Sequence, residues 1–163
     1  MAFPSFIFQD WKSNSHNTKG KIIMVSFRIA NYARHRKIIK LLFYPYIAFY
    51  KLTFEWVLGV EIPYKATVGK GLKVLHGHAL VVNEKTRIGE NCILRHSTTI
   101  GNDGRSDACP ILGNNVNVGA NVCIIGGVNV GNNATIGAGS VVVKDVPANV
   151  VVVGNPARII NHV

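Results

Sequence analysis

The amino-acid sequence predicts an all-β parallel β-helix built from hexapeptide repeats and preceded by a short α-helical region. Three observations predict this fold: aliphatic residues recur every six residues after Gly59, apolar residues before that point follow helical spacing, and sixteen glycines interrupt the apolar runs. We therefore divide the 163-residue chain into an α-helical N-terminal cap, residues 1–58, and a β-helix domain, residues 59–163.

The cap shows helical periodicity from Lys21 to Leu58. Pro45 interrupts this segment, so we expect a kink or a break near Phe43 or Tyr44. The first dozen residues have aromatic character without a clear period, and they form an arm that is either ordered or disordered. The apolar positions at helical spacing are Ile22, Val25, Ile29, Ala33, Ile38, Leu42, Pro45, Phe49 and Leu52.

The β-helix domain is defined by the phase of its aliphatic residues. A six-residue repeat with one inward aliphatic side chain suits a triangular coil of three short strands, and about eighteen residues then make one coil. Each coil buries these side chains only against its neighbours, so the open end needs a cap. A β-sandwich would show strands of uneven length instead. The positions in phase are Ile62, Val68, Val74 and Leu80, then, after a slip of two residues, Ile88, Leu94 and Ile100, and, beyond a loop, Leu112, Val118, Ile124, Val130, Ile136 and Val142.

The charge of the chain narrows the class of partner. Lysine and arginine number 18 against 8 acidic residues, a formal net charge of +10, which favours polyanionic partners. Most of the surplus precedes Gly71, and the segment after Gly89 is nearly neutral and rich in asparagine. Because no basic stripe with interleaved aromatic residues runs through the repeats, we exclude nucleic acid as a partner.

Three cysteines, an odd number, and the lack of a cleavable signal pattern predict a reducing, cytoplasmic compartment. The longest apolar stretch, Leu41 to Tyr50, is too short to span a bilayer. The basic segment Arg34-His35-Arg36-Lys37 precedes an apolar run, so it suits a peripheral contact with the inner face of the plasma membrane. A trimer cap with solvated charges fits the same pattern, and both interpretations stay open.

The chain resembles the hexapeptide-repeat acyltransferase superfamily in its serine acetyltransferase-like branch. Within that branch it is most similar to the colanic-acid and capsular-polysaccharide biosynthesis acetyltransferases, and the resemblance covers nearly the whole chain. The motifs that carry it are Val60-Glu61-Ile62, Gly69-Lys70-Gly71, His76-Gly77-His78-Ala79-Leu80-Val81-Val82, Arg95-His96-Ser97-Thr98-Thr99-Ile100-Gly101-Asn102, Ile136-Gly137-Ala138-Gly139-Ser140-Val141-Val142, Asp145-Val146-Pro147 and Gly154-Asn155-Pro156-Ala157-Arg158.

The resemblance implies a left-handed parallel β-helix, a homotrimer, and acetyl-CoA as acyl donor in the groove between subunits, without a metal. The left hand comes from the resemblance alone, because the general rule for parallel crossovers predicts the right hand. The activity implied is transfer of an acetyl group from acetyl-CoA to a hydroxyl group.

Acyl transfer to a hydroxyl needs a base that takes its proton, and histidine suits this role. In serine acetyltransferases the base is a histidine paired with an aspartate fifteen residues earlier, and His76 and Glu61 occupy these positions. We expect His78 on the same strand and the same side as His76. His96 follows His76 by twenty residues, one coil plus the slip, so the two rings should stack about 5 Å apart on neighbouring coils.

The loop from Asn102 to Pro110 interrupts the repeats and is expected to shape the acceptor pocket. Serine acetyltransferases carry an Arg-His pair before the corresponding proline and an acidic residue before the catalytic histidine, whereas this chain has Ala108-Cys109 and Leu75. Both anchors for an amino acid are missing, so we reject serine and favour a sugar hydroxyl as the acceptor. The candidate substrate-binding residues are His96, His78, Asn102, Asp103 and Arg105.

The acyl donor is expected against glycine-rich corners late in the β-helix. Small side chains there let a pantetheine arm approach the backbone, and basic side chains suit the cofactor phosphates. The candidate residues for binding acetyl-CoA are Gly126, Gly127, Ala138, Gly139, Ser140, Lys144, Pro156 and Arg158.

The leading hypothesis is therefore an acetyl-CoA-dependent O-acetyltransferase that modifies a saccharide in polysaccharide biosynthesis. Serine O-acetyltransferase of cysteine biosynthesis is the alternative within the same branch. A metal-binding β-helix of the γ-carbonic anhydrase type, with zinc held by His76, His78 and His96, is the alternative of another class. A structural trimer without activity is the last.

Overall fold

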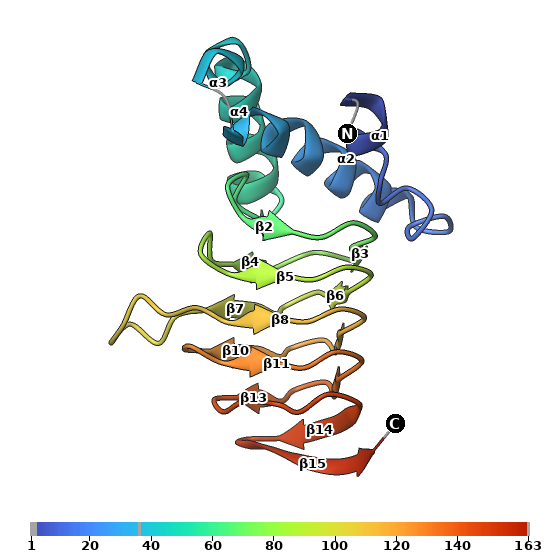
Figure 1. Ribbon diagram of the computed structural model, residues 1–163. Coiled ribbons are helices and arrows are strands. Elements are labelled where there is room, and N and C mark those ends of the chain that lie inside the picture. The colour runs from blue at the N-terminus through green and yellow to red at the C-terminus, as the bar shows by residue number, and fades with distance from the viewer. Residues whose placement is uncertain (1–2, 36, 163) are drawn as a thin grey trace.

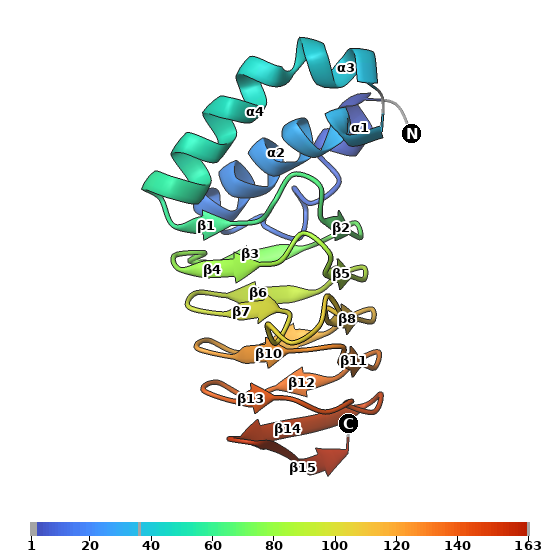
Figure 2. The same ribbon diagram turned by 90° about the vertical axis from the view of Figure 1, so that its left-hand side faces the viewer.

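The computed structural model describes residues 3–35 and 37–162 and forms a left-handed parallel β-helix capped by helices at one end. The helices cover the first coil, the chain winds away from them coil by coil, and the C-terminal hairpin lies at the far end (Figures 1 and 2). All strand pairs are parallel except β14 with β15, which run antiparallel.

Each side of the triangular coil stacks its strands into one sheet. The first sheet contains β1 (Val60–Glu61), β4 (Leu80–Val82), β7 (Thr99–Gly101), β10 (Cys123–Ile125) and β13 (Val141–Val142). The second contains β2 (Thr67–Val68), β5 (Arg87–Ile88), β8 (Ile111–Leu112) and β11 (Asn129–Val130). The third contains β3 (Lys73–Leu75), β6 (Ile93–Arg95), β9 (Asn117–Val118), β12 (Thr135–Ile136), β14 (Val150–Gly154) and β15 (Ala157–His162).

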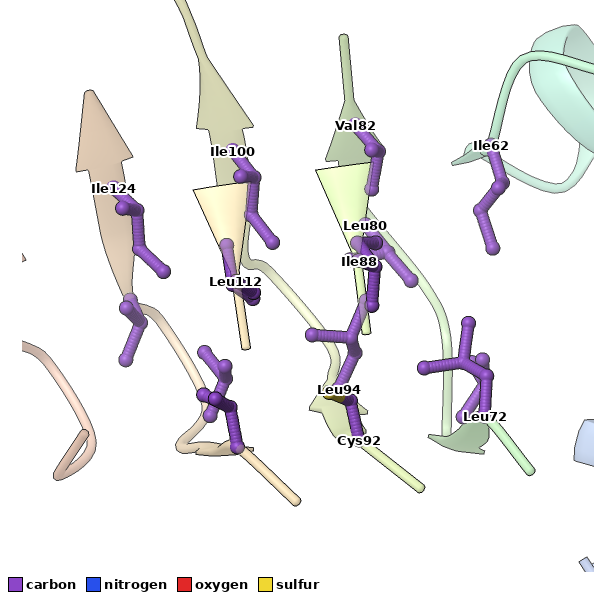
Figure 3. Close-up of a cluster of buried hydrophobic side chains, with 14 of the residues drawn as sticks. Ile62, Leu72, Leu80, Val82, Ile88, Cys92, Leu94, Ile100, Leu112 and Ile124 are labelled. Atoms are coloured by element: carbon purple, nitrogen blue, oxygen red, sulfur yellow. The ribbon is translucent and has the colours of Figure 1, made fainter. Parts of the chain in front are cut away.

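The core is a column of aliphatic side chains inside the coils. Ile62, Val82, Ile100 and Ile124 occupy equivalent places on successive coils and form a row (Figure 3). A second inward residue lies two positions earlier in each repeat, as Thr98 does before Ile100, and it is also buried. The predicted six-residue phase is therefore confirmed, and its cause is burial of these side chains against neighbouring coils.

The strand register corrects one detail of the sequence prediction. Val82, rather than Leu80, is equivalent to Ile100, because these two residues pair between β4 and β7. The two extra residues therefore lie between Val74 and Val82, at the corner that contains His76, and not after Leu80. Leu80 is nevertheless fully buried, since it occupies the second inward position before Val82.

The cap consists of short helices, and the predicted break at Pro45 is confirmed. One helix ends at Leu42 and the next begins at Tyr44, with Phe43 between them and Pro45 in the first turn, where a backbone N–H is not required. Residues 3–12 of the arm at the start of the chain are ordered. The elements are α1 (Phe3–Ile7), α2 (Thr18–Tyr32), η1 (Ala33–His35), α3 (Lys37–Leu42), α4 (Tyr44–Tyr50) and the π-helical η2 (Lys51–Val57).

Side chains of the cap satisfy the open edge of the first coil. The Asn14 side chain donates to the Leu72 carbonyl and accepts from the Val74 amide, and the Asp10 carboxylate accepts from the Leu72 amide. Arg28 forms a buried ion pair with Asp10, with 2.7 Å between Nε and Oδ2. Without these partners, the first coil would bury unpaired backbone groups or expose an edge to other strands.

Candidate active site

The corner between β3 and β4 presents two histidines. His76 follows β3 directly with φ of +66°, and Gly77 and Ala79 also have positive φ values. The prediction that His76 and His78 share a strand was wrong: both lie in the turn, so the two-residue period of a strand does not align them. A Cβ atom at Gly77 would lie 2.8 Å from Ile23 Cδ1, so this glycine lets α2 pack against the corner.

His76 and His96 meet on neighbouring coils, as predicted. Their ring centroids are 5.5 Å apart and the rings are edge to face. The cause is the strand register. Leu75 of β3 pairs with Arg95 of β6, and each histidine is the next residue after one member of this pair. His76 is exposed, whereas His96 is half-buried, and its Nδ1 atom is buried without a hydrogen-bond partner. The pair therefore offers one accessible imidazole supported by a second.

His78 is exposed and lies beside Gly59 at the start of the first coil, since a Cβ atom there would be 4.0 Å from His78 Cε1. The ring contact at this corner joins His76 to His96 and does not include His78. Across residues 3–35 and 37–162, no three side chains of histidine, cysteine, aspartate or glutamate are grouped so that they could hold a metal ion.

Glu61 is exposed on β1, where it pairs with Val81 of the strand that follows the His76 corner. The structure gives no hydrogen bond between the Glu61 carboxylate and His76.

Glu55 was not predicted as a site residue, but it lies on η2 close enough to Glu61 for their charges to interact. Burial raises the pKa of the Glu55 carboxyl, Lys51 lowers it and Glu61 raises it, and Glu55 Oε1 is buried without a partner. An acidic residue within an apolar helix was the sequence signal for it.

The loop between β7 and β8 projects from the stack (Figure 1) and is held by short polar contacts. Asp103 Oδ1 accepts hydrogen bonds from the amides of Arg105 and Ser106, which lower the pKa of its carboxyl. Asp107 forms an ion pair with Lys85, with 2.7 Å between Oδ2 and Nζ. The exposed side chains of Asp103 and Arg105 are thus displayed on a loop of defined shape, while Asn102 is half-buried at its base.

Two adjoining hollows bring the loop and the predicted donor residues together. One, of about 430 Å³, is lined by Asp103 and Arg105 of the loop and by Gly126, Gly127 and Lys144 of later coils. The loop lies close over the glycines, since a Cβ atom at Gly127 would be 3.0 Å from the Ala108 side chain. The second hollow, of about 410 Å³, is lined in part by Lys144, Pro156 and Arg158.

The remaining predicted donor residues, Ala138, Gly139 and Ser140, lie at the corner before β13 and line neither hollow. Ala138 and Gly139 are exposed, and Gly139 has φ of +72° with open space where a side chain would be. The Ser140 side chain is fully buried, and its Oγ accepts a hydrogen bond from the Gly154 amide. Ser140 therefore joins two coils.

Comparison with known proteins places this arrangement in a family. The chain is 37% identical to WcaB of Escherichia coli strain K12, whose name assigns it to acetyl transfer in colanic acid biosynthesis, over 94% of this chain and 98% of that protein. The chain belongs to the hexapeptide-repeat acetyltransferases of the serine acetyltransferase-like branch. The predicted resemblance is thereby confirmed. No family model matches the chain.

Serine acetyltransferases are also among the relatives. Serine acetyltransferase 4 of Arabidopsis thaliana is 33% identical over 89% of this chain, which spans 40% of that longer protein. Among solved structures, the serine acetyltransferase of Brucella abortus strain S19 in complex with coenzyme A superposes with a TM-score of 0.81 at 29% identity, over 98% of this chain and 68% of that one. Soybean serine acetyltransferase complexed with serine gives 0.82 at 31% identity, over 97% and 69%.

Proposed function

We propose that this acetyltransferase moves the acetyl group of acetyl-CoA to a hydroxyl group of a saccharide during polysaccharide biosynthesis. One observation carries the proposal. An exposed histidine, His76, stands at an inserted corner beside His96, in a chain similar to WcaB over nearly its whole length. The likeness to a serine acetyltransferase solved with coenzyme A supports the donor.

The proposed chemistry is a direct transfer in which His76 is the general base. The acceptor hydroxyl oxygen attacks the thioester carbonyl carbon while the His76 imidazole takes the hydroxyl proton. The carbon–sulfur bond then breaks, and the proton returns to the departing thiolate of coenzyme A. Glu61 would move its exposed carboxylate to the imidazole, where it stabilises the cation and orients the ring. No covalent enzyme intermediate is required.

For the donor, we propose the two adjoining hollows late in the β-helix. Gly126 and Gly127 would admit the pantetheine arm to the backbone, and Lys144 and Arg158 would bind the phosphates. Pro156 would line the same path, and the exposed corner of Ala138 and Gly139 would extend it beyond the hollows. We leave Ser140 out of this proposal, because its hydroxyl is buried and bonded within the coil stack.

For the acceptor, we propose that His96, His78 and the loop residues Asn102, Asp103 and Arg105 form the pocket. The protein lacks the two sets of residues expected to bind serine, because Leu75, Ala108 and Cys109 stand at those positions. Bidentate recognition of a carboxylate by a guanidinium group therefore has no replacement there. Neutral hydroxyl groups of a sugar suit the amide, carboxylate and imidazole groups that remain.

We propose a homotrimer in the cytoplasm, peripheral to the inner face of the plasma membrane, as the working form. In such a trimer, the outward faces of neighbouring β-helices would pack together. The donor hollows, which are open in the single chain, would then gain a second wall. Residues 3–35 and 37–162 contain no helix with the length and hydropathy needed to cross a bilayer.

Release of free coenzyme A thiol from acetyl-CoA tests the proposal. The assay compares the native protein with His76→Ala, each with a panel of saccharides and with serine as acceptors. We expect saccharide-dependent release that falls by about 10²-fold or more in the variant. Release driven by serine would return the protein to cysteine biosynthesis, and release unchanged by the substitution would remove His76 from the mechanism.

A further inference from the structure

The helical run from α3 through η2 is apolar on both of its long faces. Its inner face packs on the core and the first coil through buried Ile47, Tyr50 and Phe54, and the Tyr50 hydroxyl donates to the Ile62 carbonyl. Its outer face exposes large apolar side chains to between 54% and 81% of their area. They are Ile38, Leu41, Leu42, Phe49, Leu52, Trp56 and Val57.

An outer face of this kind is unusual for a helix that faces water. A surface helix normally carries polar residues opposite its apolar stripe, and a helix that is apolar all round is covered by protein or lipid. A contiguous run of large apolar side chains on a soluble surface marks an interaction site. The rest of the molecule packs on the other side of this run: η2 contacts β1 of the first coil, and α4 contacts α2, which lies between α4 and the coils (Figure 2).

Among the described side chains of α3, α4 and η2, Lys40 and Lys51 are exposed and positive, whereas Glu55 is acidic and only partly exposed. Glu61 and Glu84 of the first coil lie on the Glu55 side of these helices. From Arg34 to Leu58, the sequence carries five basic residues and one acidic residue, Glu55, whose Oε1 atom is buried. A hollow of about 240 Å³ lies between these helices and the first coil. It is lined by Lys40, Tyr44, Ile47, Ala48, Lys51 and Tyr64. Two ammonium groups and two phenol rings beside apolar side chains suit an anionic headgroup.

We propose that the outer face of α3, α4 and η2 is a docking surface for a membrane of anionic phospholipid. The helices lie in the plane of the interface with Leu41, Leu42 and Trp56 among the acyl chains, and Lys40 and Lys51 bind headgroup phosphates. Apolar burial and attraction to anionic lipid act together in such interfacial helices. A second copy of the chain fits this surface less well, because it would bring two positive faces together.

This orientation has a consequence for the rest of the molecule. The docking surface lies at the capped end, and the hollows lined by Lys144 and Arg158 lie toward the C-terminal end of the stack (Figures 1 and 2). The β-helix would therefore stand away from the bilayer with its donor hollows open to the aqueous phase. The His76 corner, on the first coil, would be close to the membrane. This docking surface rests on the peripheral membrane location proposed above and is independent of which acceptor the site takes.

Vesicle co-sedimentation of the full chain tests the docking surface. Phosphatidylcholine vesicles are compared with vesicles that also contain phosphatidylglycerol, at low and high salt. We expect binding to the anionic vesicles that weakens with salt, and partition reduced about tenfold or more in Lys40→Glu/Lys51→Glu, since each lysine contributes appreciably near an anionic surface. The double variant Leu41→Gln/Trp56→Gln should bind less strongly at both salt concentrations, because it loses apolar contacts with the acyl chains, which salt does not screen.

Ile160→Gln is the matched control, since Ile160 is 62% exposed at the opposite end of the molecule and its loss should leave binding unchanged. Circular dichroism and sedimentation velocity of each variant establish that the fold is retained. Absence of binding to anionic vesicles would overturn the proposal. So would equal partition of the native protein and both surface variants, or a smaller assembly in the apolar variant, which would mean that another copy of the chain covers this face.

Discussion

The imidazole rings of His76 and His96 meet edge to face, 5.5 Å apart between centroids, although twenty residues separate them in the chain. They occupy equivalent positions on successive coils, because Leu75 pairs with Arg95 immediately before them. His96 thereby forms one wall of the space that the exposed His76 ring occupies. A change at His96 is expected to alter the orientation of the His76 ring, while the His76 imidazole remains present as the base.

The His96→Ala substitution should reduce kcat/KM for the acceptor about ten- to hundredfold, because His76 loses its supporting ring. The loss should be smaller than that of His76→Ala, and the affinity for acetyl-CoA should be unchanged. Steady-state release of thiol, with the acceptor varied at saturating donor, measures the effect. His162→Ala, at an exposed histidine near the C-terminus, is the control. An effect confined to acetyl-CoA binding would contradict this assignment.

The Lys144→Ala substitution should weaken binding of coenzyme A about tenfold, the effect of losing one charge-assisted hydrogen bond to phosphate. Lys144 lines both adjoining hollows, so its ammonium group is central to the proposed donor path. Isothermal titration calorimetry with coenzyme A at two salt concentrations measures the change. The control is Lys70→Ala, which removes an exposed lysine on the first coil beside Glu90. Equal affinity of the native and Lys144→Ala proteins would move the donor site elsewhere.

The Asp10→Ala substitution should destabilise the protein by about 3–5 kcal/mol, because it leaves the buried Arg28 guanidinium without its carboxylate. The Leu72 amide also loses its acceptor. Thermal and urea unfolding measure the change in stability. The exposed pair between Lys65 and Glu84 is the matched control, and Glu84→Ala should cost less than about 1 kcal/mol. Similar losses in both variants would mean that the buried pair does not hold the cap on the first coil.

The Glu55→Gln substitution should make stability less dependent on pH. Burial raises the pKa of Glu55 in the folded state, so its contribution to stability is complete below the ordinary glutamate pKa and is lost as pH rises through the raised value. The variant should therefore gain on the native protein as pH increases from about 4 to 8, by less than about 1 kcal/mol because the side chain is partly exposed. Melting temperatures across this range measure the difference, with the exposed Glu84→Gln as control. A constant difference would contradict the assignment.

The sequence predicted the features that depend on regular spacing. The six-residue phase of Ile88, Leu94 and Ile100 predicted the coils. The interval between His76 and His96 predicted their contact, because parallel strand pairing places residues that are one coil apart in sequence directly above one another. It failed where the chain departs from the repeat. Leu80 is aliphatic and lies six residues after Val74, so the phase alone could not show that the extra residues precede it.

The sequence by itself determined the fold, the family and the candidate base, since each depends on residue identity at fixed intervals. Only the tertiary structure decided that His76 lies in a turn with positive φ, that the loop carrying Asp103 folds over Gly126 and Gly127, and that Glu55 is partly buried near Glu61. The exposed outer face of the cap also emerged only there. These features depend on how nonrepeating segments pack against the coils, and such contacts join residues whose separation in sequence follows no period.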